Sequence, residues 1–148
     1  MSGAETVVVA AQRPAALTVL RDYATLTKPK VQSLLLLTTI TTMYVAGDPS
    51  IGLVLLTCLG GALSAGGAGA INHAVDRDID RTMARTATRP VASGRVSPRA
   101  AIAFGVSLGL ASFVLLSLTV NPLAASLSLA GLLGYVGVYT LWLKRRTP

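Results

Sequence analysis

Four long apolar stretches make up most of the chain after its first thirty residues. They extend over about 31–47, 51–74, 98–118 and 122–143. A transmembrane α-helix needs about 20 predominantly apolar residues to cross the hydrocarbon core of a bilayer. The pattern therefore predicts an all-α, multi-pass transmembrane bundle with four membrane-spanning helices, of which the first is the shortest.

Turn-forming residues separate these stretches and set their bounds. An Asp-Pro-Ser turn at 48–50 follows the first stretch, and an Asn-Pro pair at 121–122 divides the third from the fourth. Such pairs are typical of tight turns. Residues 90–98 contain two prolines and a glycine, so we expect a loop there. Ser97-Pro98 is a typical N-cap followed by proline at the first helical position, and it predicts where the third span begins.

The segment before the first span has a different character. Residues 1–13 lack the basic region that precedes the apolar run of a signal peptide, and we expect a disordered tail there. Residues 14–28 carry three leucines and a tyrosine near helical spacing, with charged residues on the remaining surface. This pattern predicts a short helix at the membrane interface. Residues 14–148 are then expected to form one membrane domain.

Composition and charge support the same class of protein. Of 148 residues, 52% are hydrophobic and only 13% charged, and the mean hydropathy is +0.63. The net charge is +7, and all thirteen Lys and Arg residues lie within 13–30, 75–99 and 144–146. The two opposite turns, at 48–50 and 119–122, have none. Because basic residues concentrate on the cytoplasmic side of membrane proteins, we expect the N-terminus and the 75–99 loop in the cytoplasm. Membrane lipid, and not nucleic acid, is the partner that this distribution indicates.

A row of polar residues follows the second apolar stretch. Asn72, Asp76 and Asp80 are spaced four residues apart, which places them above one another on one face of a helix. Two carboxylates so placed repel each other unless a cation lies between them. Mg²⁺ suits this position, because it takes oxygen ligands and is usually held by one or two carboxylates together with substrate phosphates. The row therefore predicts a metal site where a helix leaves the membrane.

Arginines repeat at the same interval on a neighbouring face. They are Arg77, Arg81, Arg85 and Arg89. Guanidinium groups are good partners for phosphate oxygens, so the segment has the chemistry of a metal-diphosphate site. The alternative is a solvated charged helix end in which the aspartates pair with these arginines. Ionisable groups at the end of a membrane span are usually functional, which favours metal binding.

Two further polar residues lie beside the row. Asp78 faces away from it, and we expect a salt bridge or a supporting role for this residue. His73 is the only histidine, and no cysteine lies near it. We expect it to be a polar residue at the helix edge, not a zinc ligand.

Small residues fill the second half of the second span. The run GGALSAGGAGA at 60–70 predicts close helix packing in lipid, and it could also leave room for a bulky ligand beside the polar row. Gly105 and Gly109 form a GxxxG pair in the third span. Aromatic residues near the end of the fourth span indicate an interface belt before the basic 144–146 segment.

These motifs together resemble a known family. NxxxDxxxD at 72–80, MARTATRP at 83–90 and the small-residue run before them are similar to the UbiA superfamily of intramembrane prenyltransferases. TLTKPKVQSLLLLTT at 25–39 and YTLWLKRRTP at 139–148 resemble, more narrowly, its haem O synthase branch. The resemblance covers the chain from about residue 20 onward.

The resemblance implies a reaction and roles for residues. Asn72, Asp76 and Asp80 would hold Mg²⁺, with Asp76 and Asp80 as the catalytic carboxylates. The diphosphate of a polyprenyl donor would be bound by Arg85, Arg89 and Lys28. The branch transfers a farnesyl group from farnesyl diphosphate to a vinyl group of haem b, which gives haem O. Haem A synthase or terminal oxidase assembly proteins are further partners that it implies.

The resemblance also implies more protein than this sequence contains. Members of the superfamily have about nine membrane helices and a second Asp-rich motif in a later loop. No acidic residue follows Asp80 here, so we expect the N-terminal part of such an enzyme in the plasma membrane, inactive alone. Two alternatives stay open. One is a prenyltransferase for an aromatic or quinone precursor, and the other is a non-catalytic membrane protein.

Overall fold

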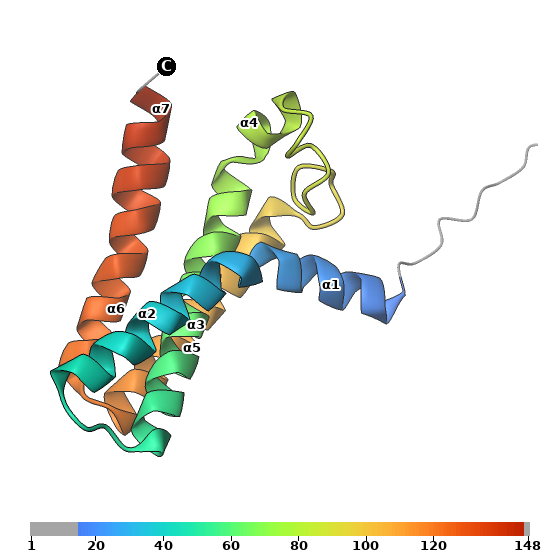
Figure 1. Cartoon of the computed structure of the whole chain (residues 1–148). Helices are drawn as coiled ribbons and strands as arrows, with labels where there is room; N and C mark the ends of the chain where they lie inside the picture. Colours follow the sequence, from blue (N-terminus) through green and yellow to red (C-terminus); the bar gives the residue numbers. More distant parts are fainter. Residues whose placement is uncertain (1–14, 147–148) are drawn as a thin grey trace, which may run out of the picture.

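The computed structural model describes residues 15–146, and these are helical apart from turns and one loop (Figure 1). The helices are α1 (Ala16–Leu26), α2 (Pro29–Ala46), α3 (Ile51–Val75), α4 (Arg77–Thr82), α5 (Pro98–Thr119), α6 (Pro122–Gly134), the π-helix η1 (Tyr135–Leu143) and α7 (Lys144–Arg146). The described residues contain no strand, so the all-α prediction is confirmed. The predicted N-terminal tail lies outside the described residues.

Three helical segments are long and apolar enough to cross a membrane. They are Ile51–Val75, Pro98–Thr119 and Pro122–Arg146. Their bounds lie within three residues of the second, third and fourth predicted spans. A helix of 18 residues, α2, also forms where the first span was predicted, but it does not reach the same apolarity. The polar residues that α2 carries among its leucines account for this difference.

The threonine hydroxyl groups of α2 have hydrogen-bond partners within the helix. Thr38, Thr39, Thr41 and Thr42 each donate to the backbone carbonyl four residues earlier, at 2.8–2.9 Å. A polar group without a partner is costly in a lipid environment. Because the helix backbone provides an acceptor for each of these hydroxyl groups, the threonines do not prevent α2 from lying in hydrocarbon.

Side-chain caps begin three of the long helices. The Ser50 hydroxyl accepts from the Leu53 N–H at 3.2 Å, Ser97 from Ala100 at 3.1 Å, and the Asn121 side-chain oxygen from Ala124 at 2.7 Å. Each bond satisfies one backbone donor that a helix N-terminus leaves without a partner. The predicted start of the third span at Ser97-Pro98 is confirmed.

The closest packing of the bundle is between α3 and α5. A Cβ atom added to Gly67 would lie 2.6 Å from the Gly105 carbonyl oxygen, and one added to Gly105 would lie 2.7 Å from the Gly67 oxygen. The Ser112 hydroxyl donates to the Gly60 carbonyl at 2.7 Å across the same contact. Any side chain at these glycines would separate the helices, so the packing role predicted for the small-residue run is confirmed.

A short helix, α1, extends sideways from the bundle (Figure 1). It confirms the helix predicted within 14–28, and it exposes Leu17 and Leu20. Lys28 joins α1 to α2 in a left-handed conformation with φ 53°. That conformation costs a non-glycine residue about 1–2 kcal/mol. Strain of this kind persists where the surroundings fix the residue, often at a functional site.

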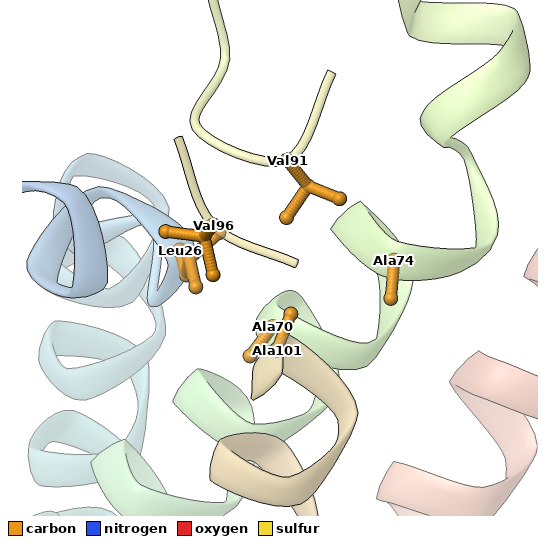
Figure 2. Packing of buried hydrophobic residues seen from close by; sticks show 6 residues of the cluster. All are labelled: Leu26, Ala70, Ala74, Val91, Val96 and Ala101. Atoms are coloured by element: carbon orange, nitrogen blue, oxygen red, sulfur yellow. The ribbon is translucent and has the colours of Figure 1, made fainter. Parts of the chain in front are cut away.

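A small hydrophobic cluster holds the loop after α4 against the bundle. Figure 2 shows its members, which come from α1, α3, α5 and the 90–97 segment: Leu26, Ala70, Ala74, Val91, Val96 and Ala101. Leu26, Val91 and Ala101 are fully buried. The loop is therefore a packed part of the structure, which places Arg89 next to Asp80.

The fourth predicted span is one continuous rod, but it is not α-helical throughout. After Gly134 the hydrogen-bond pattern widens to the π-helix η1, which continues to Leu143. π-Helical turns are rare and are frequent at functional sites. The expectation of a simple α-helix over 122–143 is wrong for its last nine residues.

Candidate functional site

The predicted polar row lies where α3 gives way to α4. The helix bends at Asp76, so the three residues do not share one straight helix as expected. Their spacing nevertheless survives, because the Asp76 N–H donates to the Asn72 carbonyl at 2.9 Å and the Asp80 N–H to the Asp76 carbonyl at 2.8 Å. Asn72, Asp76 and Asp80 are 2%, 0% and 3% exposed. The row is therefore not solvated as the alternative supposed, although Asp80 does pair with one of the arginines, Arg89.

The Asp80 end of the row is held by the loop that follows it. Arg89 Nη1 donates to both carboxylate oxygens of Asp80 at 3.0 Å. The Thr86 hydroxyl donates to the Asp80 backbone carbonyl at 2.8 Å. A guanidinium beside a buried carboxylate compensates its charge. Arg89, one of the predicted diphosphate ligands, is thus part of the site.

The Asn72–Asp76 end is held by the last helix of the chain. Lys144 Nζ lies 2.6 Å from Asp76 Oδ2, and Asn72 Nδ2 donates to the same oxygen at 2.9 Å. The fully buried Thr140 hydroxyl donates to Asn72 Oδ1 at 2.9 Å. The sequence predicts no role for Thr140 or Lys144. The sequence predicts only that Lys144 and the row lie on the same side of the membrane, and this does not specify a contact between them.

The oxygen atoms of the row fit a hard divalent cation. Asp76 Oδ1 is buried and has no hydrogen-bond partner among the described residues. A buried carboxylate oxygen without a partner is costly, and a cation would satisfy it. No group of three or more His, Cys, Asp or Glu side chains suited to a metal occurs within 15–146. Two carboxylates and an amide are a sufficient protein contribution for Mg²⁺, since this ion completes its shell with water and phosphate oxygens.

The predicted arginine series does not continue past α4. The helix ends at Thr82, and Arg81 turns to donate to the Ala92 carbonyl at 2.8 Å. Arg85 is exposed and has no hydrogen bond or ion pair with any residue of the described part. The structure therefore brings Arg89 to the row and leaves Arg85 in solvent.

Lys28 is the third predicted anion ligand. Its Nζ lies 6.0 Å from the centre of the Tyr135 ring. Burial lowers the pKa of the Lys28 ammonium, repulsion from Arg89 lowers it further, and attraction to Asp76 opposes the shift. The positive charges of this region therefore repel one another, and an anion bound among them would be stabilised by all of them.

The two neighbours of the row depart from expectation. His73 is 3% exposed and its Nδ1 has no partner among the described residues, so it is a buried residue and not an edge residue. Asp78 faces away from the row as expected. It is exposed, however, and forms no ion pair within the described part of the chain, so the predicted salt bridge is wrong.

An apolar cavity of about 390 Å³ opens beside the site between α2, α3 and α6. Small residues of α3 form one wall, among them Gly61, Ala65 and Ala68, and Lys28 and Tyr135 also line the cavity. Its volume is in the range of ligand pockets. The small-residue run thus serves both purposes considered from the sequence, because one part packs helices and another leaves space.

The fold and the site define a class of protein: a helical membrane protein with a buried row of acidic and amide side chains where a span ends. A comparison with protein families gives a match to the UbiA prenyltransferase family over residues 35–148. The chain belongs to this family. No solved structure matches it.

Three curated relatives of the chain carry the same name. It is 56% identical over 129 residues to the protoheme IX farnesyltransferase of Streptomyces avermitilis, which covers 86% of this chain and 42% of the relative. It is 56% identical over 137 residues to that of Chloroflexus aurantiacus, covering 91% and 23%, and 55% identical over 128 residues to that of Roseiflexus sp., covering 85% and 24%. The chain thus spans less than half the length of these relatives.

Proposed function

We propose that this chain provides the first metal- and diphosphate-binding part of a protoheme IX farnesyltransferase. The observation that carries the proposal is the buried Asn72, Asp76 and Asp80 row, faced by Lys144 and Arg89, in a chain of the UbiA family. The substrates would be farnesyl diphosphate and haem b, and the product haem O. The name shared by the curated relatives supports this choice of donor and acceptor.

The residues of the row would hold Mg²⁺ through Asn72 Oδ1 and the carboxylates of Asp76 and Asp80. Bound Mg²⁺ would neutralise charge on the diphosphate as it leaves. Arg89 and Lys28 would bind the diphosphate oxygens, and Arg85 would join them on the rim of the site. Asp76 and Asp80 are the catalytic carboxylates of this proposal, since they position the donor's leaving group.

The reaction breaks the bond between farnesyl C1 and the diphosphate oxygen, and the bonding pair leaves with diphosphate. A vinyl carbon of haem b then bonds to C1, and water adds to the resulting cation and loses a proton. The product carries a hydroxyethylfarnesyl side chain. The apolar walls formed by Gly61, Ala65 and Ala68 would take the isoprenoid chain and keep bulk water from the allylic cation.

The membrane arrangement belongs to the same proposal. We infer that α2 crosses the bilayer together with the three more apolar spans, which gives four spans as predicted. Figure 1 places the α2–α3 and α5–α6 connections at one end and α4 and α7 at the other. The basic residues of the described part then lie on one side, which the positive-inside rule assigns to the cytoplasm. The site would face the cytoplasmic side of the plasma membrane.

Filling the cavity tests the donor assignment. Gly61→Leu projects a side chain from a position where no atom lies within 4 Å of an added Cβ, so it should fill space without disturbing packing. We expect farnesyl diphosphate affinity to fall about 10-fold or more, the change that 1.4 kcal/mol produces, while the affinity for Mn²⁺ alone stays unchanged. Titration calorimetry in nanodiscs measures both. Gly52→Leu, equally unobstructed but outside the cavity lining, is the matched control.

The acceptor requires a longer protein. A chimera that joins this chain to the remaining part of the Streptomyces avermitilis relative can be expressed with haem b supplied, and the haems extracted and separated. Haem O is the expected product. Farnesylation of an aromatic or quinone precursor in its place would support the alternative acceptor. An Mg²⁺ affinity that is the same with and without farnesyl diphosphate would support the non-catalytic alternative.

A further inference from the structure

Thr140 is a residue of the π-helix η1 that contacts the polar row. Its side chain is fully buried, and its hydroxyl lies 2.9 Å from Asn72 Oδ1. The same hydroxyl lies 3.2 Å from the Tyr135 backbone carbonyl, five residues earlier, which is the offset of a π-helix. One hydroxyl group therefore has two acceptors within reach, while it has only one proton to donate.

The orientation of the Asn72 amide decides what the row can bind. With Oδ1 toward Thr140, the amide nitrogen donates to Asp76 at 2.9 Å. Two members of the row are then hydrogen-bonded to each other, and the Asn72 oxygen points away from Asp76. To offer Oδ1 to a cation beside Asp76, the amide must turn over. Its nitrogen then faces Thr140, which must change from donor to acceptor. A threonine with no other acceptor would leave its own proton unsatisfied in a buried site.

The π-helix supplies that second acceptor. When the amide turns, the Thr140 hydroxyl can donate to the Tyr135 carbonyl and accept from Asn72 Nδ2, so each buried polar group keeps a partner. We propose that Thr140 is a positioning residue which allows the Asn72 amide to change from a donor toward Asp76 to an oxygen ligand for a cation. This inference rests on the proposed function, because it assigns a supporting residue to its metal site.

The sequence offers a direct probe of this exchange. Asparagine occurs only at positions 72 and 121, so labelling with ¹⁵N-asparagine gives two pairs of side-chain amide signals in NMR spectra of the 148-residue chain. Asn121 caps α6 at the opposite end of the bundle and serves as an internal reference. In the wild type, we expect addition of Mg²⁺ to shift the Asn72 signals and to leave those of Asn121 unchanged.

Two substitutions separate the hydroxyl from the packing of Thr140. Thr140→Val keeps the shape and removes the hydroxyl, whereas Thr140→Ser removes only a methyl group. We expect the valine variant to lose the Mg²⁺-dependent Asn72 shift and to bind Mn²⁺, detected by electron paramagnetic resonance, roughly 10-fold or more weakly, as is typical when a supporting partner of a metal ligand is lost. The serine variant should retain both. If the valine variant does not fold, Thr140→Ala replaces it in the same comparison.

The possible outcomes are distinct. Wild-type behaviour of the valine variant would overturn the role of Thr140, and so would an equal loss in the valine and serine variants. If neither Mg²⁺ nor Mn²⁺ affects the wild type, the metal site of the proposed function falls. The metal-free Asn72 signal, compared between the wild type and the valine variant, still decides whether Thr140 orients the amide.

Discussion

The two ends of the polar row are equally buried but are held by very different parts of the chain. Asp80 is bound by Arg89 and Thr86, nine and six residues further along. Asn72 and Asp76 are bound by Thr140 and Lys144, each 68 residues away. One end is therefore completed by its own loop. The other end is completed only when the last membrane helix packs against α3.

This difference shows how one short motif can depend on both local and global structure. The loop that carries Arg89 is fixed by the cluster around Val91 and Ala101, so the Asp80 end forms with α3, α5 and the loop. The Asn72–Asp76 end needs the π-helix to bring Thr140 and Lys144 to the correct face. A disturbance of the fourth span should therefore affect Asp76 first and Asp80 later.

Removing each carboxylate should produce the largest effects and separate the two ends. We expect Asp76→Asn and Asp80→Asn to lower Mn²⁺ affinity by more than the roughly 10- to 100-fold that loss of a supporting group causes. In the chimera described above, either change should abolish haem O production without preventing membrane insertion. The two variants should differ in limited trypsin digestion. Asp76→Asn frees Lys144 and should speed cleavage at 144–146. Asp80→Asn releases the loop from the row and should speed cleavage after Arg85 and Arg95, because trypsin does not cut the Arg89–Pro90 bond.

A neighbouring carboxylate provides the control for this comparison. Asp78 is exposed and has no ion pair within 15–146, so Asp78→Asn should leave Mn²⁺ affinity and both cleavage rates near those of the wild type. Identical digestion patterns for the Asp76 and Asp80 variants would show that the two ends are not held independently. Retained haem O production in either variant would refute the metal role of the row.

Most of the Asp80 end, which its own loop completes and which we call the local end, could be predicted from the sequence. The spacing of Asn72, Asp76 and Asp80, the loop at 90–98 and the Ser97 cap depend on neighbours a few residues away, and local patterns report such features. The arginine series failed because it assumed that α4 continues beyond Thr82. The sequence gives no strong helix stop before Pro90, so hydrogen bonds made by Arg81 and Thr86 decide where the helix ends.

Replacing the cation of the local end should have a smaller effect than removing the carboxylate. Arg89→Ala should weaken binding of farnesyl diphosphate by about 10-fold, since hydrogen bonds to charged groups contribute about 1.5–3 kcal/mol. Mn²⁺ alone should be affected much less, because Asp80 keeps its oxygen atoms. Arg85→Ala is the matched control from the same loop, and its exposed position predicts a smaller loss. An equal loss of farnesyl diphosphate affinity in the two variants would show that Arg85 binds the diphosphate as directly as Arg89 does.

The Asn72–Asp76 end, which residues far away in the sequence complete, could not be predicted in the same way. Hydrophobicity located the fourth span within a few residues, but an apolar helix in lipid has no sequence signal that fixes its rotation. Thr140 and Lys144 contact Asn72 and Asp76 from a segment that forms the wider π-helical turn, and the run YVGVYTLWL has no feature that predicts that turn. Contacts between residues 68 positions apart come from packing and are visible only in the structure.

The smallest effect is expected from removing a second contact that holds the loop, the ion pair between Asp22 of α1 and Arg95. Arg95 Nε donates to both Asp22 oxygens at 3.1 and 3.2 Å, but the Arg95 side chain is 46% exposed. A partly exposed pair contributes about 0.2–1 kcal/mol, so Asp22→Asn should lower the unfolding temperature only slightly. Trypsin should cleave faster after Arg95 and no faster after Lys144, and Mn²⁺ affinity should not change. Asp48→Asn, an exposed position in the opposite turn, is the control. A loss of Mn²⁺ affinity in the Asp22 variant would mean that α1 helps to hold Asp80 through the loop. The Asp80 end would then depend on a distant helix as well as on its own loop.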